Sequence, residues 1–169
     1  MKEFNMKHFD NCTLDECGFK ILEEAAEVYA EWQDIYKDGC ECGSCDLANT
    51  TSLGCPDYIK LGDELYDVLQ VCVNTSALIG DTRSYDGRIR DYVIDKDCMQ
   101  RFLGYVAYVH VLIQQYDGST FDQNNINGIV NIVVGYLMEI AHAYGIDMAK
   151  AVERGTKRNI ERGRISEDK

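Results

Sequence analysis

Residues 62–74, GDELYDVLQVCVN, place two acidic side chains inside a largely apolar segment. On a helix with about 3.6 residues per turn, Glu64 and Asp67 fall on one side together with Val71 and Asn74. Apolar side chains cover nearly all of the remaining helix surface, which is typical of a buried helix. Two ionised carboxylates in such a place are costly unless a cation neutralises them. The segment therefore predicts a core helix with a cationic partner at this acidic pair.

The rest of the chain shows helical periodicity and no convincing run of alternating strand residues. Trp32 belongs to the apolar stripe of the first predicted helix, which favours core packing over stacking on a base. Gly80 suits a helix C-cap and Asp147 a helix N-cap. Five helices are predicted, over about 17–36, 58–79, 98–116, 126–144 and 147–161.

The predicted fold is an all-α helical bundle with a four-helix core. Residues 81–97 are expected to form a polar connection, and DGST with residues 122–125 a turn. The helix pair within 17–79 and the pair within 98–144 share one order of elements, which indicates a degenerate duplication. The second pair lacks the acidic residues of the first, so we expect it to supply packing.

Length and charge limit the functional classes. The 169 residues suit a single domain, here 1–169, and the net charge of −12 argues against nucleic acid polymers or an anionic membrane as partners. The first residues carry scattered charges, unlike a secretory signal, and no apolar run is expected to span a bilayer. We therefore expect a cytoplasmic protein that handles cations, or anions through cations.

Four cysteines gather in one loop insertion at about 38–57. Their C-x-C-x2-C-x9-C spacing could supply a tetrahedral zinc site, or the loop could hold free thiols. Cys12 and Cys17 could join such a site, whereas Cys72 and Cys98 lie in apolar helical patterns and are expected in the core. The four candidate zinc ligands are Cys40, Cys42, Cys45 and Cys55.

The first predicted helix adds further acids, Glu23, Glu24, Glu27 and Glu31. Glu24 and Glu27 have the same i, i+3 spacing as the acidic pair of the buried helix. If the two helices pack side by side, four carboxylates meet at one seam and suit a hard cation, Mg²⁺ or Mn²⁺. The alternatives are a solvated acidic face on the first helix and Lys or Arg partners for the second.

Basic residues concentrate near the end of the chain. Lys150, Arg154, Lys157, Arg158, Arg162 and Arg164 could clamp phosphate or simply favour the C-terminal end of a helix. Lys20 and Lys60 each lie one turn before an acidic motif, where they could touch phosphate or pair with the acid four residues on. Asn74 could contact a base or sugar, or act as a core hydrogen bonder.

Together these motifs resemble the all-α nucleoside triphosphate pyrophosphohydrolases, the MazG-like proteins and dimeric dUTPases. The resemblance lies in E-E-x-x-E at residues 23–27, E-x-x-D at residues 64–67, and the tail AHAYGIDMAKAVERGTKRNIERGRI. It extends to Lys20, Lys60, Asn74 and Gly80. Two features depart from the family: the long interval that holds the cysteine loop, and the extra helix before the tail.

The resemblance implies Mg²⁺-dependent hydrolysis of a nucleoside triphosphate to the monophosphate and pyrophosphate, in nucleotide-pool sanitation. The metal ligands would be Glu24, Glu27, Glu64 and Asp67, and the general base Glu27 or Glu23. Substrate would be bound by Lys20, Lys60, Asn74, Arg154, Lys157 and Arg158. The resemblance also implies a homodimer, although this longer chain could supply a four-helix core alone.

Two alternative functions are a di-iron protein and a non-catalytic binding module. Glu139 and His142 form an E-x-x-H, the motif of di-iron bundles, but neither other histidine has Glu three residues before it. The second alternative is a non-catalytic helical binding module, in which a metal stabilises the bundle and the cysteine loop contacts a partner.

Overall fold

The computed structural model describes residues 6–38, 55–80 and 93–166. These residues form five helices and contain no strand, which confirms the predicted all-α bundle. The helices are α1 (Leu14–Asp38), α2 (Pro56–Leu78), α3 (Lys96–Gln114), α4 (Thr120–Ala143) and α5 (Met148–Glu161).

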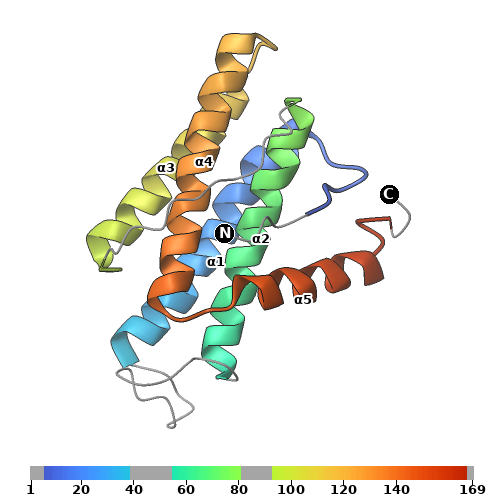
Figure 1. Ribbon diagram of the computed structural model, residues 1–169. Helices are drawn as coiled ribbons and strands as arrows, with labels where there is room; N and C mark the ends of the chain where they lie inside the picture. The colour runs from blue at the N-terminus through green and yellow to red at the C-terminus, as the bar shows by residue number, and fades with distance from the viewer. Residues whose placement is uncertain (1–5, 39–54, 81–92, 167–169) are drawn as a thin grey trace.

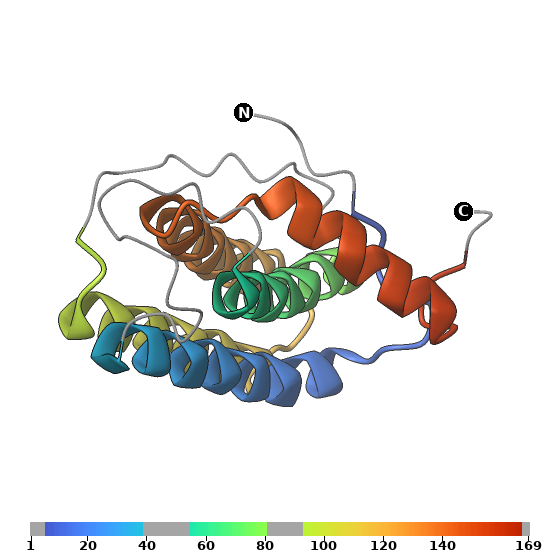
Figure 2. The same ribbon diagram turned by 90° about the horizontal axis from the view of Figure 1, so that it is seen from below.

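Helices α1 to α4 form the core, and α5 crosses it from outside (Figure 1, Figure 2). α1 packs on α2 and α3, and α4 packs on the same two helices, so each core helix has two neighbours within the core. α5 packs on α2. Figure 2 shows three levels, with α1 beside α3, then α2 beside α4, then α5. The pairs α1–α2 and α3–α4 complete the core, and their origin by duplication stays a prediction.

Helix α2 is therefore enclosed by α1, α4 and α5. Leu61, Leu65, Tyr66 and Val68 have no exposed surface. This arrangement confirms the core helix predicted from its nearly continuous apolar surface. The acidic residues of α2 remain partly exposed because they face the edges where α1 and α5 pack against it.

The helix ends follow from local capping chemistry. Thr13 and Glu16 form a reciprocal capping box before α1, in which Thr13 N donates to Glu16 Oε2 at 2.8 Å. Ser119 caps α4 by accepting from Asp122 N, and Asp147 caps α5 as predicted. Ile79 is the C-cap of α2, and Gly80, at φ 81°, directly follows it and donates its N–H to Ala77 O, so Gly80 ends the helix one residue beyond the cap.

Two predicted boundaries are wrong. Residues 122–125, expected in a turn, lie in the first turns of α4, because the cap at Ser119 starts the helix earlier. The predicted polar connection includes Lys96 and Asp97, which instead open α3 behind the cap Asp95. The rest of that connection, residues 81–92, and most of the cysteine loop, residues 39–54, lie outside the described residues.

The interior matches the apolar stripes. Trp32 is fully buried, as predicted, and its indole N–H donates to the Tyr144 hydroxyl at 2.8 Å. Cys72 and Cys98 are buried, also as predicted. Trp32 stacks on Tyr36 with ring centroids 4.8 Å apart, which extends this aromatic packing toward the end of α1.

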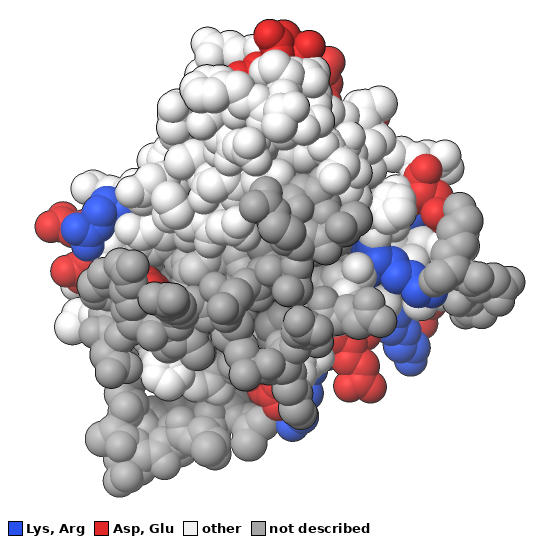
Figure 3. All heavy atoms as spheres, turned by 45° about the horizontal axis from the view of Figure 1, so that its top comes forward, with Lys and Arg blue, Asp and Glu red and all other residues white. Residues whose placement is uncertain are grey.

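Helix α4 corrects the expectation that no apolar run is long enough to span a bilayer. Among the described residues it alone has the required length and composition, with mean hydropathy 1.3. However, 56% of its apolar window is buried inside the bundle, as in the core helix of a soluble protein. It contains no lysine or arginine. Figure 3 shows few basic atoms over the upper part of the molecule.

Helix α5 lies close to α2 because small residues allow it. A Cβ atom at Gly155 would lie 2.1 Å from the Tyr66 ring, and one at Gly62 would lie 2.9 Å from Ile146. Asn159 Nδ2 donates to the Tyr66 hydroxyl at 3.0 Å, and that hydroxyl donates to Gln70 Oε1 at 2.9 Å. This contact fixes the position from which α5 presents its basic side chains.

The N-terminal segment, residues 6–13, is bonded both to α2 and to the turn after α5. Gln70 Nε2 donates to Lys7 O at 2.8 Å, and Phe9 N donates to Asn74 Oδ1 at 2.9 Å. Asp10 N donates to the carbonyl of Arg164 at 3.2 Å. The Arg164 guanidinium lies over the Phe9 ring, 5.8 Å from its centroid. The two ends of the described chain thus meet beside α2.

We predict that Gly155→Ala destabilises the fold, because the added methyl would overlap the Tyr66 ring and displace α5. Overpacking of this kind costs about 1–3 kcal/mol or more. Thermal unfolding followed by circular dichroism measures the loss. The matched control is Gly128→Ala in α4, where nothing lies within 4 Å of the added atom. It should be neutral or stabilising. Equal melting temperatures for wild type and Gly155→Ala would contradict the prediction.

Candidate functional site

The structure brings three carboxylates together between α1 and α2. Glu24 and Glu27 come from α1 and Glu64 from α2, with one oxygen of each within 4.8 Å of the others. Glu24 is buried, Glu64 is partly buried and Glu27 is exposed, so the cluster lies in the wall of the bundle with one side open. Ile21, Ala25 and Val28 are fully buried, and this apolar stripe turns the Glu24–Glu27 side of α1 toward the seam.

The cluster carries more negative charge than its surroundings neutralise. Burial, then the hydrogen bond and charge of Glu27, and to a smaller extent the charges of Asp67 and Glu24, together raise the pKa of the Glu64 carboxyl to about 7. Lys20 Nζ lies 2.8 Å from Glu24 Oε1 and 2.9 Å from Glu23 Oε2, so one ammonium serves two acids. A bound divalent cation would supply the missing positive charge.

The donor set fits Mg²⁺ or Mn²⁺. Carboxylate oxygens are the ligands that hard divalent cations prefer, and no soft or nitrogen ligand belongs to this group. Three acids from two helices can approach one ion while the open side leaves room for water or phosphate oxygens. The residues present therefore suit such an ion, which would be held by Glu24, Glu27 and Glu64.

Asp67, the fourth predicted ligand, lies outside this group of three. Its Oδ2 is 3.2 Å from an Arg158 nitrogen, and it faces the same small pocket as Glu24 and Glu27. The pKa of the Asp67 carboxyl is raised to about 6, mainly by burial; Arg158 opposes this rise, and Glu24 and Asp63 add to it. Asp67 thus stands beside the cluster with a cationic partner already in place.

The small pocket, of about 200 Å³, joins the acids to basic residues. Arg162 and Arg164 from the end of α5 and the following turn line it, as does Lys20 of α1. Both arginines are exposed, and neither forms an ion pair with any other residue in the described part of the chain. The pocket is therefore lined by both carboxylates and guanidinium groups, a combination that suits a phosphate bound through a cation.

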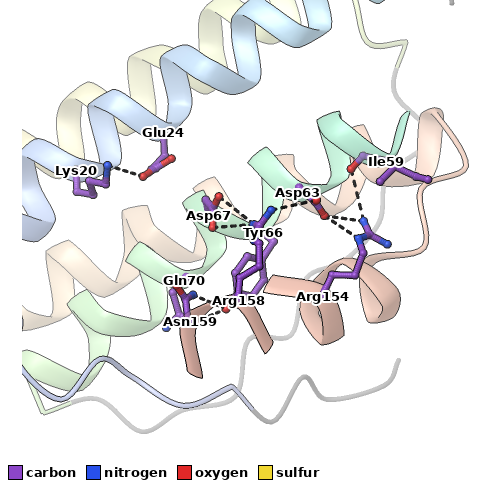
Figure 4. A network of polar contacts seen from close by, with 10 residues as sticks. All are labelled: Lys20, Glu24, Ile59, Asp63, Tyr66, Asp67, Gln70, Arg154, Arg158 and Asn159. Carbon is purple, nitrogen blue, oxygen red and sulfur yellow. Dashed lines mark hydrogen bonds and ion pairs between the residues drawn. The ribbon is translucent and has the colours of Figure 1, made fainter. Parts of the chain in front are cut away.

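Arg154 and Arg158, which lie within α5, bind α2 instead (Figure 4). Arg154 approaches Asp63 Oδ1 with two nitrogens, at 2.6 and 3.0 Å, and Arg158 reaches Asp63 Oδ2 at 3.1 Å as well as Asp67. Asp63 was not among the predicted site residues. A signal for it exists in the sequence, since Asp63 and Asp67 are spaced by four, as are Arg154 and Arg158, so one helix edge matches the other.

The remaining predicted site residues fall in different places. Lys60 pairs with Glu31 across the α1–α2 contact, rather than with Glu64 four residues on. Lys157 is exposed and lies 4.0 Å from Glu161. Glu23, with 60% of its side chain exposed, lies outside the three-acid group and contacts Lys20. Lys20 therefore pairs with the acid four residues on, one of the two roles weighed for it, and also lines the small pocket.

A larger pocket of about 530 Å³ adjoins the small one. The two share Phe9, Lys20, Val71 and Arg164, so they form neighbouring parts of one depression. Asn74, predicted to bind substrate or to act in the core, is buried and lines the larger pocket. Its Oδ1 accepts from Phe9 N and from Gln70 Nε2. The contribution of the N-terminal segment was not foreseen, because nothing local in residues 6–13 marks a pocket wall.

The cysteine predictions stay largely untested. Cys40, Cys42 and Cys45 lie outside the described residues, and Cys55 is buried at the N-cap of α2. Cys12 and Cys17 line the larger pocket, and no disulfide joins any of the described cysteines. The zinc site stays a prediction.

Comparison with known proteins adds no identification. No protein-family model, no curated protein and no solved structure matches this chain. The resemblance to the all-α pyrophosphohydrolases therefore rests on the motifs in the sequence.

We predict that the metal-free protein loses stability as pH rises from about 4.5 to 7. The pKa of Glu64 is raised from 4.5 to about 7, so the folded state holds this proton more tightly than the unfolded chain. The unfolded chain releases the proton first, and the free energy of unfolding falls as the pH increases through this window. The raised pKa of Asp67 acts in the same direction.

Glu64→Gln should accordingly melt at a higher temperature than wild type at pH 8 without divalent metal, and at nearly the same temperature at pH 4.5. After solvent screening, relief of about 1 kcal/mol corresponds to about 2–4 °C. Scanning fluorimetry at both pH values measures it. Glu153→Gln, at an exposed position on α5, is the control for loss of one charge. Identical melting of wild type and Glu64→Gln at pH 8 would show that the repulsion is absent.

Proposed function

We propose that this protein hydrolyses a nucleoside triphosphate to the monophosphate and pyrophosphate with Mg²⁺ or Mn²⁺. The observation that carries the proposal is the meeting of Glu24, Glu27 and Glu64 at the α1–α2 seam, with Arg162 and Arg164 lining the small pocket that Glu24 and Glu27 also line. These are three of the four acids that the sequence resemblance assigns to metal binding. A role in cytoplasmic nucleotide-pool sanitation and a homodimeric state belong to the same proposal.

The roles of the residues follow from their positions. Glu24, Glu27 and Glu64 would hold the divalent ion, which would supply neutralisation of phosphate oxygens and a more acidic bound water. Glu27 is exposed at the open side of the cluster and interacts with Glu64, so it is the better placed general base. Glu23 contacts Lys20 outside the cluster and is less well placed.

Phosphate binding divides among the basic residues. Arg162 and Arg164 line the small pocket and have no ion-pair partner among the described residues, so they can meet a triphosphate without breaking an ion pair. Lys20 can join them from α1. Arg158 would have to exchange Asp67 for phosphate, and Arg154 would have to leave Asp63. We therefore assign these two a positioning role for α5 in the absence of substrate.

A second candidate function is the non-catalytic, metal-stabilised binding module. The observation in its favour is that Lys20 and Arg158 already neutralise Glu24 and Asp67, so part of the acidic seam is held by protein cations. Such a module would use the cluster to stiffen the α1–α2 contact.

We predict that Glu27→Gln and Glu64→Gln each lower kcat for triphosphate hydrolysis by about 100-fold or more, because each removes a charge from the proposed metal ligands or the base. A panel of ribo- and deoxyribonucleoside triphosphates is incubated with Mg²⁺, and monophosphate and pyrophosphate are quantified. Glu153→Gln on α5 should retain wild-type activity. Failure of the wild type to turn over any member of the panel would refute the proposed function.

The double variant Glu24→Ala/Asp67→Ala separates the two candidates. For an enzyme we expect it to lose hydrolysis while keeping its helical content and a melting temperature close to that of the metal-free wild type. For a structural metal site, wild type should melt far lower after chelation of its metal, and the variant should resemble that chelated form. Circular dichroism with and without EDTA, alongside the hydrolysis assay, gives both readouts.

A further inference from the structure

The Asn74 side chain lines the larger pocket, and its amide oxygen is hydrogen-bonded within the fold. Asn74 is 2% exposed, and its Oδ1 accepts from Phe9 N at 2.9 Å and from Gln70 Nε2 at 3.0 Å. These two donors fix which end of the amide is the oxygen. The amide nitrogen donates to no other residue in the described part of the chain, although the residue lines the 530 Å³ pocket. Its N–H groups are therefore available to a pocket occupant.

The surroundings of this amide are mainly apolar. Phe9 and Phe19 contribute aromatic rings to the pocket, and Val71 contributes an aliphatic wall. A flat ring can be enclosed by such groups, while the charged residues Lys20, Glu23 and Arg164 also line the pocket. An acceptor atom on that ring would pair with the Asn74 N–H groups, which donate to no other residue in the described part of the chain.

The pocket also has a fixed relation to the acidic cluster. Lys20, Val71 and Arg164 line both pockets, so a ligand with an anionic end among the acids and arginines extends directly into the larger space. A nucleotide has this shape, with phosphates at one end and a heterocycle at the other.

We propose that the larger pocket binds the nucleobase of the substrate and that the Asn74 amide nitrogen donates to a carbonyl oxygen on its ring. This assignment deepens the proposed function and rests on it. It favours bases that carry a carbonyl oxygen, namely uracil, thymine, cytosine and guanine, over adenine, whose acceptors are ring nitrogens. Because the amide oxygen is already engaged, Asn74 reads acceptors only.

Nucleosides test the assignment apart from hydrolysis, because they need neither metal nor the acidic cluster. Deoxyuridine, deoxyguanosine, deoxyadenosine and 2-deoxyribose are titrated into the protein by calorimetry at pH 8 without Mg²⁺. We expect deoxyuridine to bind about tenfold or more tightly than deoxyadenosine, the difference that one hydrogen bond makes, and the free sugar not to bind. Equal affinity for deoxyadenosine, or no measurable deoxyuridine binding at millimolar concentration, overturns the assignment.

Asn74→Asp is the sharpest variant. It keeps an oxygen for Phe9 N and Gln70 Nε2, and these two donors favour the ionised form, which has no N–H to offer the pocket. Deoxyuridine affinity should fall about tenfold and the preference over deoxyadenosine should disappear. Asn131→Asp, an exposed position on α4, adds the same charge and should change nothing. An unchanged preference in folded Asn74→Asp overturns the assignment.

Phe19→Ala gives a second test if Asn74→Asp does not fold. Phe19 is 63% exposed, so its removal should spare the bundle while deleting one wall of the pocket. Nucleosides should bind more weakly, with the carbonyl preference retained; unchanged affinity overturns the assignment. If the nucleosides behave as expected but no triphosphate is hydrolysed, the proposed function alone fails. If triphosphates are hydrolysed without any base preference, the assignment alone fails.

Discussion

The structure depends on the burial of one helix that carries acids. α2 contacts α1, α4 and α5, and its apolar residues occupy most of its surface, so its acidic residues are only partly exposed. Glu64 and Asp67 must therefore lie where neighbouring helices meet. At the α1 edge Glu64 meets two further acids, and burial together with their charge raises its pKa. At the α5 edge Asp67 meets an arginine. α2 thus makes one contact with excess negative charge, at the α1 edge, and one balanced contact in which acids meet arginines, at the α5 edge.

The balanced contact holds α5 in place. Asp63 and Asp67 on α2 face Arg154 and Arg158 on α5, and Gly155 between the two arginines lets the helices approach closely enough for these pairs to form. Ion pairs of this partly exposed kind contribute modestly to stability, so the close packing of Tyr66 against α5 carries more of the attachment. The attachment in turn brings Arg162 and Arg164 to the small pocket.

The sequence was sufficient for features that depend on periodicity. The five helices, the core position of Trp32 and the meeting of Glu24 and Glu27 with Glu64 all follow from residues three or four apart on one helix face. Boundaries set by single caps, such as Ser119, were missed because a serine in a polar run is also typical of a turn. Whether Arg154 binds phosphate or Asp63 depends on how α5 crosses α2. Helical periodicity in the sequence does not predict that crossing. The pocket wall at Phe9 depends on a contact with Asn74 across 65 positions of the chain.

The joining of the two chain ends has a consequence for biosynthesis. Lys7 and Asp10 bond to Ser166, at sequence separations of 159 and 156 residues. A ribosome exposes the first partner long before the second, so the wall shared by Phe9 and Arg164 can close only after translation has passed α5. The four core helices are complete in the chain before α5 is made, whereas the larger pocket gains its Arg164 wall only after α5 has been synthesised.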